Sequence, residues 1–221
     1  MISRQLKQTY YFLSRYPMAL NGWRHRHLNK PKGIVKVHLG PGQSNYLKGW
    51  INVDANIVSA KADIWADIRN PLPFPDASVD IFYSHHVIEH LPDALLQFHF
   101  LELSRCLKKG GVIRVGGPNG DMAARKLTEG DVEWFGVYPD ERESLGGRFA
   151  NFILCRGEHL TILTTSYLTE VAFKAGFTNI RTCRPAVETF HPDLVGKEVL
   201  EKEYESTPDA PHTLLIEAEK K

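Results

Sequence analysis

The stretch Val35-Lys36-Val37-His38-Leu39-Gly40-Pro41-Gly42 decides the fold class of this chain. A short apolar run of this kind is typical of a buried parallel strand, and it leads directly into a Gly-x-Gly turn. Gly40 permits the sharp turn, and Gly42 lets the backbone come close to a ligand. Asp54 follows the next apolar segment, where a carboxylate can accept both hydroxyls of a ribose. The pattern predicts a nucleoside-containing cofactor at the carboxyl edge of an α/β sheet.

Two departures from the dinucleotide fingerprint narrow the cofactor class. Asn45 stands where a third glycine would stand. The spacing from Gly40 to Asp54 is also shorter than the roughly 20 residues typical of that fingerprint. Both features disfavour a nicotinamide or flavin dinucleotide.

Further motifs follow in a fixed order. They are Asp67-Ile68, then Asn70-Pro71-Leu72-Pro73-Phe74-Pro75-Asp76-Ala77-Ser78-Val79-Asp80, then Ile81-Phe82-Tyr83-Ser84-His85-His86-Val87-Ile88-Glu89-His90-Leu91, and Leu107-Lys108-Lys109-Gly110-Gly111-Val112-Ile113-Arg114-Val115. In this order the chain resembles the class I S-adenosylmethionine-dependent methyltransferases, in particular the type 11 branch. The resemblance covers residues 35–118, with a weaker similarity from His159 onward.

The resemblance implies an enzyme of α/β class with S-adenosylmethionine as its cofactor. Its sheet would be Rossmann-like, doubly wound, seven-stranded and mostly parallel, with a C-terminal antiparallel hairpin. The implied cofactor-binding residues are Leu39, Gly40, Pro41, Gly42, Asp54, Ala55, Asp67, Ile68 and Ser84. Asp54 would bind the ribose, and Asp67 the adenine amino group. Alternatively, Asp54 is a strand-end cap or surface acid, and Asp67 caps the turn over residues 68–70.

Hydrophobic patterns place the elements around these motifs. We expect strands at 35–39, 51–53, 62–65, 79–83, 112–115, 179–184 and 212–217, the last at a half-exposed edge because apolar and polar residues alternate in it. We expect helices at 92–107, ended by Gly110-Gly111, and at 165–175. Residues 43–50 are too few for a crossover helix.

The amino-terminal segment differs in charge from the rest of the chain. No acid precedes Asp54, and the first 53 residues hold nine Lys or Arg, against 18 basic and 26 acidic residues thereafter. We therefore expect a basic helical arm or lid at 1–32 and a methyltransferase domain at 33–221, with an insertion at about 119–156. In the arm, Ile2, Leu6, Tyr10 and Leu13 would share one helix face, and Pro17 would end the helix. The arm could pack over the domain, cover the cofactor, or contact anionic lipid or substrate phosphate.

Histidines follow the fourth expected strand, where ligands bind in open α/β sheets. His85, His86 and His159 are the candidate catalytic residues, because imidazole can take a proton from a hydroxyl near neutral pH. Strand pleating would send His85 and His86 to different sides. His90 is a further candidate base; alternatively Glu89 pairs locally and His90 packs beneath the sheet edge. A nucleophile that is already reactive would need no base.

Composition limits the remaining classes. Three scattered cysteines and the absence of a Cys/His/carboxylate spacing predict no metal site and a cytoplasmic, reducing environment. The sequence contains no run of about 18 apolar residues, so we expect no membrane span. Contact of the arm with a membrane surface and the oligomeric state stay open.

The resemblance implies methylation, with O-methylation expected, of a small-molecule or sugar/glycan acceptor. The segment Gly49-Trp50-Ile51-Asn52-Val53-Asp54 resembles relatives from surface-polysaccharide biosynthesis. Two alternatives remain. One is a non-catalytic cofactor-binding or scaffold protein of the same fold. The other is a nucleic-acid methyltransferase that uses the basic arm, which the acids of residues 121–143 disfavour.

Overall fold

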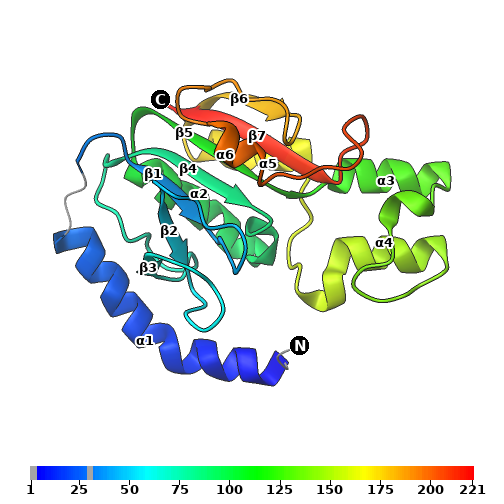
Figure 1. Ribbon diagram of the computed structural model, residues 1–221, viewed down its shortest axis with the longest axis horizontal. Helices are drawn as coiled ribbons and strands as arrows, with labels where there is room; N and C mark the ends of the chain where they lie inside the picture. Colours follow the sequence, from blue (N-terminus) through cyan, green and yellow to red (C-terminus); the bar gives the residue numbers. More distant parts are fainter. Residues whose placement is uncertain (1–3, 29–31) are drawn as a thin grey trace.

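A computed structural model describes residues 4–28 and 32–221, which form a seven-stranded sheet flanked by helices (Figure 1). The strands are β1 (Lys36–Leu39), β2 (Ile51–Asp54), β3 (Ile64–Trp65), β4 (Val79–His85), β5 (Leu107–Pro118), β6 (Phe177–Cys183) and β7 (Thr213–Lys220). Their order is β3-β2-β1-β4-β5-β7-β6. The pairs from β3 to β5 are parallel, and β7 is antiparallel to both neighbours. The expected Rossmann-like sheet with antiparallel closing strands is confirmed.

Helices cover the two faces of the sheet unequally. They are α1 (Arg4–Leu28), α2 (Asp93–Cys106), α3 (Gly120–Glu129), α4 (Leu145–Leu154), α5 (Thr165–Lys174) and α6 (Lys197–Leu200), with 3-10 turns η1 (Ile88–His90), η2 (Glu133–Phe135) and η3 (Cys155–Gly157). One face packs against α2 and α5, through residues such as Phe100 and Leu168. The other face packs against the 43–50 loop and α6, through Trp50 and Val199. The loop has no helix, as its length predicts.

The closing strand β7 is interior, so the expectation of a half-exposed edge is wrong. It lies between β5 and β6, and its first six residues are buried. The polar residue that suggested exposure, Glu217, instead forms a buried ion pair with Arg114 of β5. A polar residue in an alternating pattern can face a buried charge of opposite sign as well as water.

The glycine pair after α2 does not end that helix. The helix ends at Cys106, because Leu107 is already extended and pairs with Val79 of β4. Gly110, with φ +72°, therefore lies inside β5, within an irregularity in its register with β4. The strand is correspondingly longer than the expected 112–115.

The arm forms one helix that passes through Pro17, so the expected end at this residue is wrong. Tertiary contacts explain the continuation: Ser14 and Met18 are buried, and the Asn21 amide donates a hydrogen bond to the Trp65 carbonyl of β3 (2.9 Å). Leu6 and Leu13 are exposed, so they do not form the packed face, and Ile2 lies outside the described residues. Among the described helices, none is both long and apolar enough to cross a membrane.

The insertion at 119–156 folds into α3, η2, α4 and η3, which project from the end of β5 (Figure 1). Trp134 and Phe135 form a small core there with side chains of α4. His212 stacks on Trp134 at 4.4 Å, and the Trp134 indole donates to the Ala210 carbonyl (2.7 Å). These aromatic side chains therefore attach the insertion to the sheet.

Candidate functional site

The two glycines after β1 serve different purposes. A Cβ on Gly40 would lie 2.3 Å from a methyl group of Val87, and its φ is +72°. Gly40 therefore provides the turn and a close contact with the segment that follows β4. Gly42 has φ +54°, and a Cβ there would meet no atom within 4 Å. Its backbone borders open space, as a loop that cradles a ligand requires.

Asp54 ends β2 beside this loop. Its carboxylate accepts hydrogen bonds from the Gly42 N–H (3.1 Å) and the Asn56 N–H (2.8 Å). A carboxylate offers about four lone-pair sites, so capacity for further donors remains. The half-buried side chain thus fixes the loop and can still accept hydroxyl groups, which fits the ribose role.

Asp67 is more fully engaged than the sequence suggests. The Arg69 guanidinium donates to both carboxylate oxygens, with its Nη2 at 2.6 Å, and the Arg69 N–H also bonds Oδ1 (2.9 Å). The Asn70 N–H bonds the Asp67 carbonyl. The structure therefore shows Asp67 capping the turn over residues 68–70, the alternative weighed from the sequence. Ile68 beside it is half-buried.

The described part of the arm packs next to these residues. The Tyr10 hydroxyl donates to the Ala55 carbonyl (2.7 Å) and accepts from the Trp65 indole (3.0 Å). The Tyr11 ring lies against the Arg69 guanidinium, 4.6 Å from ring centre to Cζ. Burial raises the pKa of Tyr11. The arm therefore borders the candidate cofactor residues.

Three of the predicted cofactor residues have little exposure to solvent. Leu39, Pro41 and Ser84 are buried. The complete burial of Ser84 disfavours contact between its hydroxyl and a ligand.

His85 and His86 lie together at the end of β4, so the expectation that they point to different sides is wrong. Their rings meet edge to face at 4.5 Å, because His86 has a left-handed backbone (φ 57°) and no longer follows the strand pleat. His85 stacks beside Tyr83, and burial lowers its pKa to about 3, with His86 and Arg114 adding to the shift. At neutral pH, His85 is an uncharged, weak base.

His86 is the more accessible of the two, with 40% of its side chain exposed. Its Nε2 lies 2.9 Å from the Thr213 hydroxyl at the start of β7, and its Nδ1 lies 3.4 Å from Glu89 Oε1. It therefore connects the ends of β4 and β7 with the η1 turn.

His159 lies at a second cluster, with Glu89 and His90. One potential ligand atom from each residue lies within 4.8 Å of the others. Spacing in the sequence does not indicate this cluster, because the fold brings His159 to a pair far away in the sequence. His90 is half-exposed, so it does not pack beneath the sheet edge. Burial lowers the pKa of His159.

Glu89 is the least solvated member of this cluster. The residue is 1% exposed, and neither carboxylate oxygen has a hydrogen-bond partner in the part of the chain that the structure describes. The spacing His86-x-x-Glu89-His90 could have drawn attention to one side of this cluster. Nothing in the sequence connects it to His159.

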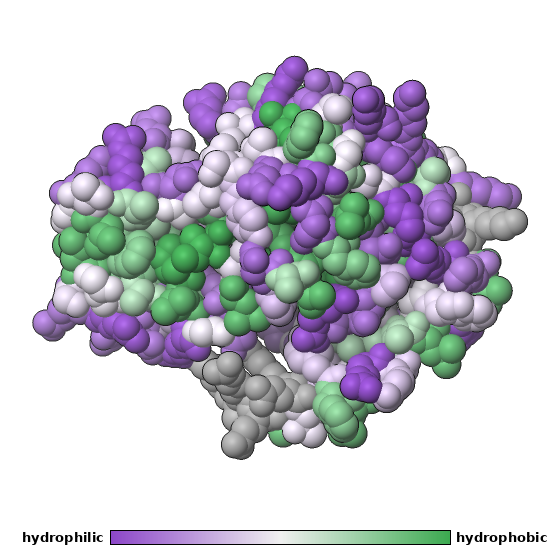
Figure 2. Space-filling view, turned by 180° about the vertical axis from the view of Figure 1, so that it is seen from behind, coloured by the Kyte–Doolittle hydropathy of each residue, from purple (hydrophilic) through white to green (hydrophobic). Residues whose placement is uncertain are grey.

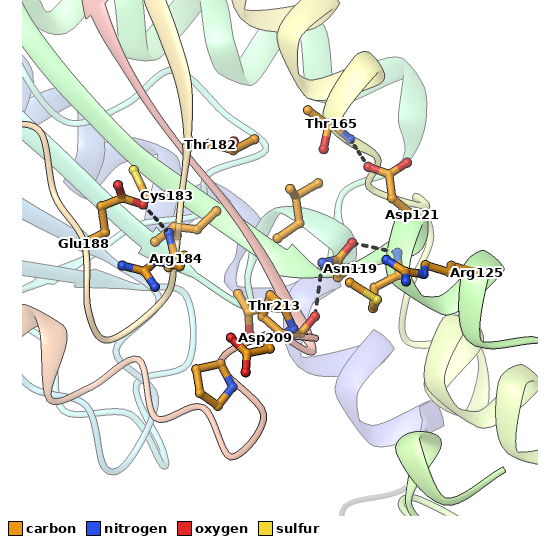
Figure 3. A pocket seen from close by; sticks show the side chains of 15 residues that line it. Asn119, Asp121, Arg125, Thr165, Thr182, Cys183, Arg184, Glu188, Asp209 and Thr213 are labelled. Atoms are coloured by element: carbon orange, nitrogen blue, oxygen red, sulfur yellow. Dashed lines mark hydrogen bonds between the residues drawn. The ribbon is translucent and has the colours of Figure 1, made fainter. Parts of the chain in front are cut away.

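A pocket of about 560 Å³ with a mixed polar and apolar lining opens at one end of the sheet (Figure 3). Its lining comes from the starts of α3, α5 and β7, the end of β6, and neighbouring loops: Asn119, Asp121, Met122, Arg125, Thr165, Thr182, Cys183, Arg184, Glu188, Pro208, Asp209, Pro211, Thr213, Leu214 and Leu215. Thr213 joins the pocket to His86. Sequence reasoning did not identify these residues, because they come from separate segments.

Apolar surface lies near the second cluster as well. Seen from behind, apolar side chains gather on the side of the molecule that carries the insertion (Figure 2). Leu154, Leu160 and Ile162, which flank His159 in the sequence, are about half exposed. The surroundings of the histidines thus combine polar and apolar surface.

Comparisons with known proteins agree with this geometry. Residues 24–115, which include β1 to β4 and most of β5, match the methyltransferase domain family Methyltransf_11. A SAM-dependent methyltransferase from Archaeoglobus fulgidus has the same fold, with 16% identity, a TM-score of 0.53, and coverage of 97% of this chain and 94% of that one. One from Thermotoga maritima has 19% identity, a TM-score of 0.51, and coverage of 97% and 95%. No curated protein matches the sequence significantly. Residues 24–115 thus match a methyltransferase domain, and the chain as a whole has the fold of S-adenosylmethionine-dependent methyltransferases.

Proposed function

We propose that this methyltransferase O-methylates a small-molecule or sugar/glycan acceptor. The observation that carries the proposal is the pocket whose lining residue Thr213 bonds His86. Hydroxyl, amide and charged side chains line it, and such groups suit the hydroxyls of a polar acceptor. The resemblance of residues 49–54 to surface-polysaccharide enzymes supports a glycan in particular.

We propose that Gly40, Gly42 and Asp54 hold S-adenosylmethionine. The cofactor supplies a methyl group on a sulfonium, which is already activated for transfer. Open space beside Gly42 and the spare acceptor capacity of Asp54 support this assignment. Leu39, Pro41 and Ser84 would support the loop from below, with Ala55 and Ile68 at its side. Asp67 would act through its turn with Arg69.

His86 is our candidate general base. Its exposure and its contact with the pocket residue Thr213 favour it over His85, whose low pKa makes it a poor proton acceptor. His85 would instead orient the His86 ring through their edge-to-face contact. His159 would face the acceptor from the other side.

The two alternative functions have less support. A non-catalytic scaffold has no need of both an open glycine loop and a pocket whose lining contacts His86. A nucleic-acid enzyme would need a basic track, yet basic residues of the insertion are paired with acids, as Arg156 is with Asp140 and Lys126 with Asp131.

We propose that the arm covers the adenosine side of the cofactor, since Tyr10 bonds Ala55 next to Asp54. Exposed apolar side chains on α1, among them Phe12 and Leu20, would allow the same helix to touch a membrane surface. The free, buried Cys106 and Cys183 support a reducing, cytoplasmic location.

The proposed function is tested with the full chain, S-adenosylmethionine labelled in its methyl group, and a panel of sugars, glycans and small hydroxylated or amine-bearing molecules. Label in a hydroxyl-bearing acceptor, with at least a tenfold lower turnover number in His86→Asn, is expected. His27→Asn, on the exposed end of α1, is the matched control. Transfer to amines alone, or equal turnover of the His86 variant, would refute O-methylation with this base.

A further inference from the structure

We propose that Glu89, His90 and His159 bind a divalent transition-metal ion, which holds the acceptor oxygen beside the cofactor loop. The metal site itself stands on geometry, and its role toward the acceptor rests on the proposed function. Neither the matched domain nor the sequence pattern assigns such a site.

The hydrogen bonds of the two imidazoles define which nitrogen is free. His90 Nδ1 lies 2.9 Å from the Glu158 carbonyl oxygen, and His159 Nδ1 lies 3.2 Å from the Ile153 carbonyl oxygen. A carbonyl only accepts, so each Nδ1 carries the hydrogen, and each Nε2 of the neutral ring keeps its lone pair. Donation of one ring N–H to a carbonyl is the usual arrangement for a metal-binding histidine.

The three side chains of the cluster therefore present lone pairs to one another, and none of the three presents a hydrogen. Glu89 has two buried carboxylate oxygens with no hydrogen-bond partner among the described residues. Leaving such a group unpaired in the interior is costly, whereas a cation would neutralise it. The distance from His90 Nε2 to Glu89 Oε1 is 3.8 Å, too long for a hydrogen bond. Two ligands about 2.1 Å from one tetrahedral ion lie roughly 3.4 Å apart, which is close to this separation.

The backbone holds these side chains in place. The Glu89 carbonyl accepts hydrogen bonds from the Leu160 N–H (2.7 Å) and the Thr161 N–H (3.1 Å), and the Thr161 hydroxyl donates to the Leu91 carbonyl (2.7 Å). The segment with His159 is thus fastened to η1. On the other side, a Cβ on Gly117 would lie 2.7 Å from Glu89 Oε2. The absence of a side chain at Gly117 leaves the carboxylate its room.

The donor set selects the kind of ion. Two imidazole nitrogens and one carboxylate suit Zn²⁺, Co²⁺, Mn²⁺ or Fe²⁺ better than Mg²⁺ or Ca²⁺, which prefer oxygen. Three protein ligands leave a position open for a further oxygen.

The position of the cluster connects it to methyl transfer. The His86 N–H bonds the Gly116 carbonyl of β5 (3.0 Å), and Val87 touches Gly40, so η1 lies between the cofactor loop and the ends of β4 and β5. A bound metal lowers the pKa of a coordinated hydroxyl. The acceptor oxygen would give its proton to His86 and form a bond to the methyl carbon. The carbon–sulfur bond would break, and its electron pair would stay on sulfur.

The test is a titration of Co²⁺ into chelator-treated, untagged, full-length protein, followed by the visible absorption of the bound ion. Glu89→Gln keeps the side-chain shape and removes the charge; His159→Ala removes a second ligand at a half-buried position. The matched control is His191→Ala, which removes the histidine of an isolated pair 3.6 Å from Glu219. Thermal unfolding of each variant establishes that it is folded.

We expect one Co²⁺ per chain, with affinity at least about 100-fold lower in both ligand variants and unchanged in the control, because even residues behind a metal ligand contribute 10- to 100-fold. Failure to bind one Co²⁺ per chain, or unchanged affinity in folded Glu89→Gln, would overturn the site. Full turnover after chelation would overturn its role in transfer. If Co²⁺ binds as expected but no hydroxyl is ever methylated, the proposed function fails and the metal site stands.

Discussion

Two buried carboxylate environments in this protein differ in how completely they are satisfied. Around Arg114, Glu203 accepts two guanidinium N–H groups (2.7 and 2.6 Å) and Glu217 a third (2.5 Å). Backbone N–H groups of Ala186 and Phe190 complete the network. Around Glu89, by contrast, no described residue donates a hydrogen bond to either oxygen.

The difference separates a structural role from a ligand-binding one. The Arg114 network joins β5, β7 and the loops over the sheet, so its charges stabilise the arrangement of the chain. Glu89 gains nothing comparable from its neighbours, although burial makes its charge costly. A carboxylate kept in such a place is better explained by something that it binds.

The largest expected effect on stability is that of Arg114→Met, which removes the cation from the satisfied carboxylates. The change removes the guanidinium and leaves two buried carboxylates without their cation, so we expect a loss of about 3–5 kcal/mol in the free energy of unfolding. Urea unfolding followed by circular dichroism measures it. Adding Glu203→Gln and Glu217→Gln to Arg114→Met should recover part of the loss. A triple variant as unstable as Arg114→Met would argue against an electrostatic origin.

Asp54 is an intermediate case, since two backbone N–H groups bind it at an accessible edge. Asp54→Ala removes a charged acceptor for ribose hydroxyls and should weaken S-adenosylmethionine binding by roughly 1.5–3 kcal/mol. Calorimetric titration gives the value. Asp63→Ala, which removes an exposed carboxylate just before β3, serves as the comparison. Equal affinity of the folded Asp54 variant and the wild type would rule out the ribose role.

His38 is a buried side chain that avoids the cost of a buried charge by staying neutral in the folded protein. Burial lowers the pKa of His38 to about 4, outweighing its contact with the Asn52 side chain (3.2 Å). Because the unfolded chain takes up a proton near pH 6.5 and the folded one does not, stability falls as the pH drops from about 6.5 to 4, by roughly 1.4 kcal/mol per unit. His38→Gln should show a shallower decline in urea unfolding across this range than the exposed-site variant His27→Gln. Parallel curves would contradict this assignment.

The smallest effect concerns Glu89 itself. In metal-free protein, Glu89→Gln removes a buried charge that receives no hydrogen bond from the described residues, and it should leave the free energy of unfolding unchanged or raise it by about 1 kcal/mol, a shift of roughly 2–4 °C in Tm. Differential scanning calorimetry in the presence of a chelator measures it. A clear loss of stability would show that the carboxylate supports the fold, as Glu203 and Glu217 do.

Local patterns were sufficient to predict most of the sheet. The run from Val35 to Leu39 and the strand before His85 are read from short-range apolar sequence, which depends little on distant partners. The errors arose where tertiary contacts override local preference: Pro17 remains helical because α1 is fixed along β3, and Glu217 looks solvent-facing because Arg114 is far away in the sequence.

The residues of the candidate site also divide into those that local sequence predicts and those that depend on tertiary contacts. Gly40, Gly42 and Asp54 follow from their positions at strand ends, and the structure places them together. The engagement of Asp67 by Arg69 and the approach of Tyr10 depend on rotamers and docking, which no spacing rule specifies. The proximity of His159 to Glu89 and His90 depends on the path of the chain after the insertion.

The interior position of β7 also constrains the order in which the sheet can be completed. During synthesis, residues 177–183 emerge from the ribosome before residues 213–220, yet among the described strands β6 has its hydrogen-bonded neighbour only in β7. The edge strand must therefore wait for a strand made later, which then pairs on both sides at once. A slow final pairing of this non-local kind leaves the β5 edge open to other chains while translation finishes.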